Sequence, residues 1–188
     1  MGSETRVFCV DYNRVVDVAE QLGHEYAAEG FRPFVAGAVD ACLAAQTAAI
    51  AARSLGIDSL LTNGVHRSDV ERVYRLLDLP RTHCFPVIAL VLGYPDVEPG
   101  YKRGRLCGPG VIHRGTYHHL ADEETDAVVV RYDRPLEQLD MGVPWSDDGY
   151  THFLDWFYEV WSKRGRRVAG AGEIFDVFVK TGFTKAGL

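Results

Sequence analysis

The 188-residue chain lacks the short motifs that mark many enzyme classes. It contains no G-x-S-x-G nucleophile elbow, no H-E-x-x-H zinc motif, no P-loop and no G-x-G-x-x-G dinucleotide fingerprint. None of its four cysteines belongs to a CxxC pair. These absences argue against the enzyme classes that depend on such motifs. If the protein is an enzyme, a bound cofactor can carry its chemistry without any of them.

We also expect neither a targeting segment nor a membrane-spanning run in this sequence. The start, MGSETR, has no signal-peptide core, and we expect no apolar run clean enough to span a bilayer. The formal charge of −6 and the pI of about 5.6 argue against nucleic acid and anionic membranes as partners. We therefore predict a cytoplasmic protein.

The composition that remains is that of an ordinary globular protein. Hydrophobic residues make up 47% of the chain and charged residues 24%. Cys9, Cys42 and Cys84 each lie inside an apolar run, where a free cysteine acts as a small hydrophobe. We expect the cysteines to be reduced, in keeping with a reducing compartment.

The strongest secondary-structure signals are three apolar strands and one long helix. The strands are predicted at Val7–Tyr12, Ile57–Leu61 and Pro86–Leu92. The helix is predicted at Phe34–Leu55, which is rich in alanine and apolar nearly all round. A chain of this size has little material to cover such a helix, so we expect a homodimer built on it.

Weaker signals complete the pattern. Ser68–Glu71 reads as a capping box that opens a helix, which Pro80 ends. Residues 96–120 are loop-like, and Ala127–Arg131 fits a short helix or a strand equally well. Two more helices are predicted at Phe153–Ser162 and Glu173–Lys180. Strands, a large helix and several outer helices predict an α+β or α/β layered fold.

Several segments, in order along the chain, resemble flavin-dependent nitroreductases, especially the NADPH-preferring, oxygen-insensitive subgroup. The matching pieces are VFCVDYNR, VDACLAAQTAAIAARSLGIDSLLTNG, DVERVYRLLDLPRTHCFPVIALVLGYP, KRGRL followed by VIHRGTY, and the C-terminal VKTGF. No single piece is diagnostic, but five in register over most of the chain are specific.

The resemblance implies a fold, a cofactor and a reaction. The implied fold is α+β, a three-layer α/β/α arrangement with a central mixed sheet and a buried central helix. It would form one domain over 1–188, with a family-like core at 1–120 and a helical extension at 121–188. The implied enzyme is a homodimer that uses FMN to pass hydride from NAD(P)H to a nitroaromatic or quinone acceptor.

The resemblance also implies cofactor-binding residues, though no catalytic side chain and no metal ligand. Lys102 and Arg105 would neutralise the flavin phosphate. Backbone groups of Thr62, Asn63 and Gly64 would approach the flavin ring. KRGR is one residue longer than the family's K-P-R, so Arg103 is an alternative match to Arg105. Without the resemblance, these segments read as a solvated basic loop and an Asn-Gly turn.

One departure from the family pattern supports a second hypothesis. The arginine-rich segment with which the family begins has no counterpart here, and Met1 falls just before the family's second strand. We therefore expect this chain, expressed alone, to bind FMN poorly. The alternative function is that of a flavin-free dimeric scaffold or an inactive, truncated relic of the family.

Three other clusters have simpler interpretations than a site. His113, His118, His119 and Asp122 lie in a glycine-rich loop, so we expect loop packing rather than a metal site. The tryptophan-rich segment around Trp156 is expected to be core or interface rather than an acceptor pocket. The last cluster reads as a solvated helix end rather than a site for the 2′-phosphate of NADPH, and consists of Arg164, Arg166 and Arg167.

Overall fold

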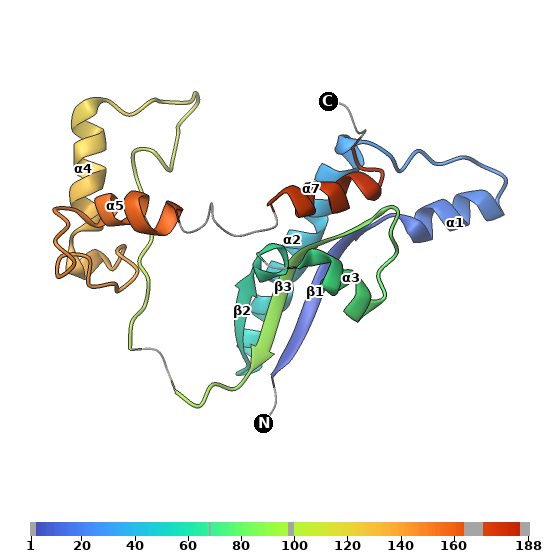
Figure 1. Ribbon diagram of the computed structural model, residues 1–188, viewed down its shortest axis with the longest axis horizontal. Helices are drawn as coiled ribbons and strands as arrows, with labels where there is room; N and C mark the ends of the chain where they lie inside the picture. The colour runs from blue at the N-terminus through green and yellow to red at the C-terminus, as the bar shows by residue number, and fades with distance from the viewer. Residues whose placement is uncertain (1–2, 68, 98–99, 164–170, 185–188) are drawn as a thin grey trace. The chain divides into compact units, whose positions relative to one another are not determined.

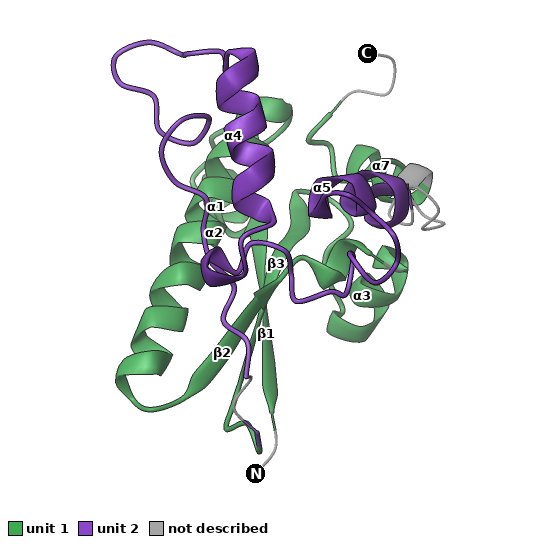
Figure 2. Ribbon diagram, turned by 90° about the vertical axis from the view of Figure 1, so that its left-hand side faces the viewer, with its two compact units in different colours: residues 1–96, 168–188 green, residues 97–167 purple. Residues whose placement is uncertain are grey.

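The computed structural model describes residues 3–67, 69–97, 100–163 and 171–184. The chain divides into two compact units, each described here by itself: a first unit of residues 1–96 and 168–188, and a second unit of residues 97–167 (Figure 2). These bounds differ from the division at residue 120 expected from the sequence, because the last helix packs against α3 (Val70–Leu77) of the first unit. The single-domain assignment stays a prediction.

The first unit is built on a three-stranded sheet (Figure 1). Its strands are β1 (Glu4–Asp11), β2 (Asp58–Thr62) and β3 (Cys84–Gly93), in the order β1-β3-β2. All three predicted strands are confirmed, and β1 and β3 begin earlier than the sequence indicated. Both strand pairs are antiparallel. The expected mixed sheet is therefore corrected for the described residues, which contain no parallel pair.

Helix α2 (Phe31–Ser54) packs against all three strands of the sheet. It is the dominant helix predicted from the sequence, and it begins three residues earlier than expected. Its buried residues are small, namely Ala41, Ala45 and Ala52. Gly37 lies against Val10 of β1, where an added Cβ would come within 2.7 Å of the Val10 Cγ1 atom. Small side chains on one face thus let α2 approach the sheet closely.

The opposite face of α2 is largely uncovered in the single chain. Five large apolar side chains on α2 are between 43% and 64% exposed: Phe31, Val35, Val39, Leu43 and Ile50. We call this set the α2 stripe. In the part of the chain that the structure describes, the expected buried central helix is therefore only half-buried.

Helix α2 also corrects the expectation that no segment is apolar and long enough to span a membrane. Its 24 residues meet that criterion by length and composition, with a mean hydropathy of 1.6 over the most apolar window. The core helices of globular proteins meet the same criterion, and α2 packs one face on a sheet. Its contacts therefore favour a core helix.

The core of the first unit is an aromatic cluster to which α2, β3 and the C-terminal helix contribute. Phe34 of α2 lies 5.8 Å from Phe85 of β3 and 4.6 Å from Phe178, measured between ring centroids. Phe178 belongs to α7 (Ala171–Lys180), and Phe183 behind it is fully buried. Edge-to-face pairs at these distances add stability beyond the burial of apolar area.

The C-terminal segment VKTGF is held by backbone hydrogen bonds. The Thr181 carbonyl accepts from the His83 amide at 2.8 Å, and the Gly182 carbonyl accepts from the Gly30 amide at 3.0 Å. Gly182 has a φ of +83°, which glycine adopts without strain. The segment thus joins the start of β3 to the start of α2.

The remaining elements of the first unit are α1 (Asn13–Gln21), a 3-10 turn η1 (Gly64–His66) and α3. The side chain that caps α3 is Asp69, whose Oδ1 accepts from the Arg72 amide at 2.8 Å. This corrects the predicted capping box by one residue, and Ser68 lies outside the described residues. The helix ends at a left-handed Asp78, two residues before Pro80.

The second unit contains α4 (Asp122–Tyr132), a 3-10 turn η2 (Pro135–Glu137), α5 (Phe153–Trp156) and a π-helical turn η3 (Phe157–Trp161). The undecided segment Ala127–Arg131 is therefore helical. Phe153 is buried and stacks on Tyr132 and Trp156. Asp133 joins α4 to α5, because its carboxylate accepts from the Phe153 amide and contacts the His152 ring.

We predict that Gly37→Ala destabilises the protein. Alanine favours a helix by about 1 kcal/mol over glycine, but a methyl group forced against Val10 costs about 1–3 kcal/mol. The net loss is measured by denaturant unfolding. The double variant Gly37→Ala with Val10→Ala is the control, since removing the opposing methyl groups should relieve the clash. A Gly37→Ala variant more stable than the wild type would contradict the close approach.

Candidate anion-binding pocket

The basic loop KRGR lies in the second unit and is pinned to the turn that follows η2. The Gly104 amide donates to the Gln138 carbonyl at 2.8 Å. The Tyr101 hydroxyl donates to the same carbonyl at 2.9 Å and lies 2.8 Å from the Asp140 carboxylate. These bonds tie Tyr101 and Gly104 to the turn after η2, so the loop between them is held in place.

Gly104 is the residue that permits this contact. A Cβ built on it would lie 1.8 Å from the Glu137 carbonyl oxygen, and no side chain can be accommodated at that distance. The position requires glycine because of the close backbone approach. This close approach explains why glycine stands between the two arginines.

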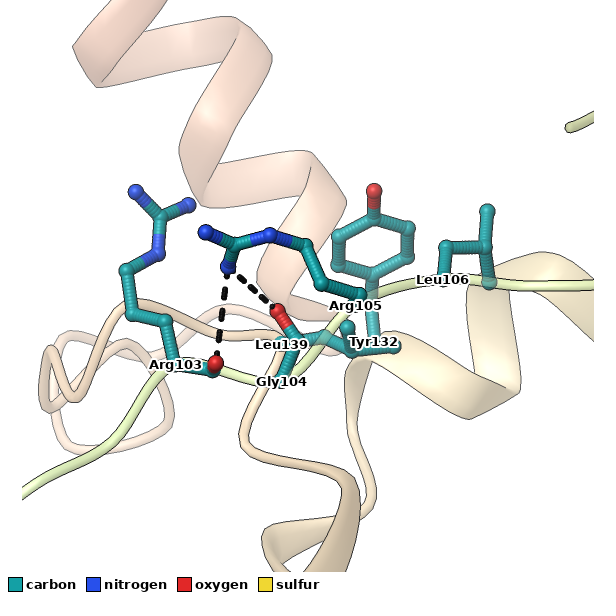
Figure 3. Close-up of a pocket in the computed structure, with 6 residues that line it drawn as sticks. All are labelled: Arg103, Gly104, Arg105, Leu106, Tyr132 and Leu139. Carbon is teal, nitrogen blue, oxygen red and sulfur yellow. Dashed lines mark hydrogen bonds between the residues drawn. The ribbon is translucent and has the colours of Figure 1, made fainter. Parts of the chain in front are cut away.

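Side chains two residues apart in an extended segment point to the same side. Arg103 and Arg105 obey this rule, and Figure 3 shows both guanidinium groups on one side of the loop. They line a cavity of about 230 Å³, together with Gly104, Leu106, Tyr132 and Leu139. Pockets for whole ligands measure roughly 300–1,000 Å³, so this cavity suits one group of a larger ligand.

The pocket has an excess of positive charge. Arg105 donates to the carbonyls of Gly104 at 2.9 Å and of Arg103 at 3.4 Å, and these are neutral acceptors. Within the described residues, neither pocket arginine forms an ion pair. The nearby carboxylate of Glu137 is taken by Arg131 at 2.6 Å and Arg134 at 3.3 Å. Two guanidinium groups on one side of the loop fit an anion such as a phosphate.

The structure brings only part of the sequence-derived site together. Arg105 lines the pocket, whereas Lys102 is exposed and is not among the lining residues. Its place beside Arg105 is taken by Arg103, which the sequence analysis treated only as an alternative to Arg105. Tyr132 was not singled out at all. The Arg-Gly-Arg spacing in a loop was the available signal for Arg103, and Tyr132 had no local signal.

The second predicted group, Thr62–Gly64, lies in the first unit at the end of β2. The Thr62 Oγ1 atom accepts from the Gly64 amide at 3.0 Å, and η1 begins at Gly64. The Asn-Gly pair thus opens a 3-10 turn rather than a hairpin. An added Cβ on Gly64 would lie 3.2 Å from the Thr62 Oγ1, so glycine also allows a close contact here.

The simpler interpretations of the other clusters agree with the geometry. His113 stacks on Tyr117 with ring centroids 4.5 Å apart, and its Nδ1 accepts from the His118 amide at 3.1 Å. These contacts pack the loop. Phe153 and Trp156 form core rather than a pocket. The last predicted cluster lies outside the described residues: Arg164, Arg166 and Arg167.

Comparison with known proteins finds curated relatives by sequence. The chain is 37% identical over 136 residues to an NADPH-dependent oxidoreductase of Staphylococcus aureus. The match covers 70% of this chain and 53% of the relative, so the chain spans about half the length of the curated relatives it matches. No protein-family model matches the sequence.

Solved structures match over nearly the whole chain. Nitroreductase A from Vibrio parahaemolyticus is 26% identical with a TM-score of 0.70, and the match covers 97% of this chain and 68% of that one. An NADPH:FMN oxidoreductase from Vibrio harveyi, solved with NAD⁺, is 26% identical with a TM-score of 0.67, at the same two coverages. The fold is thus the α+β fold of these oxidoreductases.

The order of elements, the sequence matches and the structural matches agree on one family. In sequence and in fold, the chain is similar to oxidoreductases of the nitroreductase family. The resemblance drawn from the five sequence segments is thereby confirmed.

We predict that Gly104→Ala disrupts the pocket. The methyl group overlaps the Glu137 carbonyl, so the Gly104 amide must leave the Gln138 carbonyl and the loop must move. We expect a loss of about 2–4 kcal/mol, measured by thermal and denaturant unfolding. Gly100→Ala is the matched control, because a Cβ there meets nothing within 4 Å. Equal behaviour of the two variants would show that the loop is not held against the turn.

Proposed function

We propose that this protein is an FMN-dependent oxidoreductase that transfers hydride from NADPH to an acceptor such as a nitroaromatic or a quinone. The observation that carries the proposal is the pocket of Arg103, Arg105 and Tyr132 in a chain similar to nitroreductases. The curated relative is an NADPH-dependent oxidoreductase, and one structural neighbour is an NADPH:FMN oxidoreductase. Both names support NADPH as the electron donor, and the second supports FMN as the cofactor.

The pocket residues fit the phosphate end of FMN. A phosphate monoester carries close to two negative charges near pH 7. Two guanidinium groups supply matching charge and forked donors. To bind the phosphate, Arg105 would exchange its two backbone carbonyl acceptors for charged oxygens, which form stronger hydrogen bonds.

The chain's own groups would bind and orient the cofactor rather than take part in bond breaking. When bound, FMN supplies the hydride chemistry. Arg103 and Arg105 would fix its phosphate by charge and by forked hydrogen bonds. We name no catalytic side chain and no metal, since positioning and electrostatics are the protein's part in such reactions.

The α2 stripe supports a homodimer as the functional form. Its large apolar side chains lie along one face of one helix, and a second copy of α2 would remove this face from water. Burial stabilises by about 25 cal/mol for each Å² of apolar surface. We also propose a cytoplasmic location, which agrees with the pI of about 5.6 and with four free cysteines.

The phosphate assignment is tested with Arg103→Ala combined with Arg105→Ala. Losing two charge-assisted contacts should cost about 3 kcal/mol, which weakens FMN binding about a hundredfold. Flavin fluorescence titration measures the change, and NADPH oxidation with a nitroaromatic acceptor should fall with it. Riboflavin, which has no phosphate, should bind both proteins alike.

Arg114→Ala is the matched control, because Arg114 is an exposed loop arginine of the same unit that does not line the pocket. An unchanged dissociation constant for FMN in the double variant would refute the assignment. An equal loss for riboflavin would do the same, since it would place the effect outside the phosphate.

The dimer is tested with Val39→Glu combined with Leu43→Glu, two substitutions in the α2 stripe. Two carboxylates cannot be buried unpaired between helices, so the protein should become monomeric. Light scattering at micromolar concentration gives the mass. Leu76→Glu on α3 is the control, because Leu76 is 70% exposed and lies off the stripe. A wild-type chain that scatters as a monomer would overturn the proposal.

A further inference from the structure

Cys9 of β1 and Cys84 of β3 lie on one face of the sheet. In the β1–β3 ladder, Cys9 lies opposite Pro86 and Asp11 lies opposite Cys84. Residues directly opposite each other share a face, and so do residues two apart on one strand. Cys9 and Cys84 are therefore diagonal neighbours on the same face. The ladder is irregular between Phe8 and Cys9, which places a bulge at this point.

The two thiols are neighbours on this face and differ in their environments. The neighbouring Cys84 thiol holds the pKa of the Cys9 thiol below its ordinary value. The Cys9 side chain, together with burial, raises the pKa of Cys84. Cys84 is only 2% exposed, and its carbonyl accepts from the Tyr74 hydroxyl at 2.6 Å. Cys9 is partly exposed. The first thiol is thus the more reactive and accessible one, and the second is sheltered beside it.

We propose that Cys9 and Cys84 form a reversible dithiol–disulfide pair that responds to hydroperoxides. The Cys9 thiolate attacks one peroxide oxygen, the O–O bond breaks, and Cys9 becomes a sulfenic acid. The Cys84 thiol then attacks the Cys9 sulfur, an S–S bond forms, and the S–O bond breaks with release of water. With hydrogen peroxide, two thiols are oxidised to one disulfide and the peroxide is reduced to two waters.

The strand geometry makes this disulfide reducible. Diagonal neighbours in an antiparallel pair have Cα atoms about 7–8 Å apart. Unstrained disulfides need about 4.4–6.8 Å. Closing the bond therefore draws β1 and β3 together at the bulge and stores strain, which raises the reduction potential. Such a bond opens again with a modest thiol reductant, as a redox-responsive pair requires.

The test uses the full chain with Cys42→Ser and Cys107→Ser, because these two exposed thiols would otherwise cross-link between molecules. The reduced protein is treated with hydrogen peroxide and its intact mass is measured. The expected result is a loss of two hydrogen atoms and one disulfide between the peptides that carry Cys9 and Cys84. Dithiothreitol should reverse it. The oxidised protein should also melt at a different temperature from the reduced one, because the bond restricts the unfolded chain and strains the folded sheet.

The matched control carries Cys9→Ser in addition and should show neither the mass loss nor the change in melting temperature. Two outcomes would overturn the proposal. One is an oxidised protein that keeps both thiols. The other is Cys9 gaining oxygen atoms while Cys84 stays reduced, since that would show that the thiols cannot meet. Both readings come from a protein with Cys9 and Cys84 intact, so they do not depend on how a variant of the buried Cys84 folds.

Discussion

The first unit depends on the central strand β3. It is paired on both sides, it carries the aromatic residue that meets α2 and α7, and its start is hydrogen-bonded to the C-terminal segment. A strand with two neighbours has its backbone groups satisfied within the sheet, so its side chains can be apolar on both faces. The sequence PVIALVL meets that condition. The edge strands and both terminal regions take their places from β3.

A sheet can cover only one face of a helix that is apolar all round. Small residues on the inner face let α2 approach the sheet, and the large ones of the α2 stripe are left on the outer face. A monomer gains nothing from keeping five large apolar side chains wet, because each costs free energy roughly in proportion to its exposed area. The division of small and large residues between two faces is what the proposed dimer requires, since the sheet covers one face and a second copy of the helix would cover the other.

The sequence predicted the elements whose signals are strong and local. β1, β3 and α2 have long apolar patterns, and these survive any tertiary context. α1 was missed because its valines are poor helix formers and no side chain caps its start. The cap of α3 was placed one residue early because Ser68 and Asp69 are both good capping residues. α4 was left undecided because its run of three valines favours a strand, although its acidic first turn favours a helix.

The cofactor-binding residues stay a prediction, but the structure shows which of them line the pocket. The match of KRGR to a shorter family pattern is made by residue type. The cavity, in contrast, is lined by the residues that the folded loop places around it. Arg103 and Arg105 line the cavity and Lys102 does not. Gly104 lies between the two arginines, and its backbone packs against Glu137 with no room for a side chain. That contact holds in place the segment that carries both arginines. In the described residues, Arg105 has only neutral carbonyls as acceptors and Arg103 forms no ion pair. An anion in the pocket would give both guanidinium groups a charged acceptor, which forms stronger hydrogen bonds. That exchange is the physical basis of the proposed phosphate site.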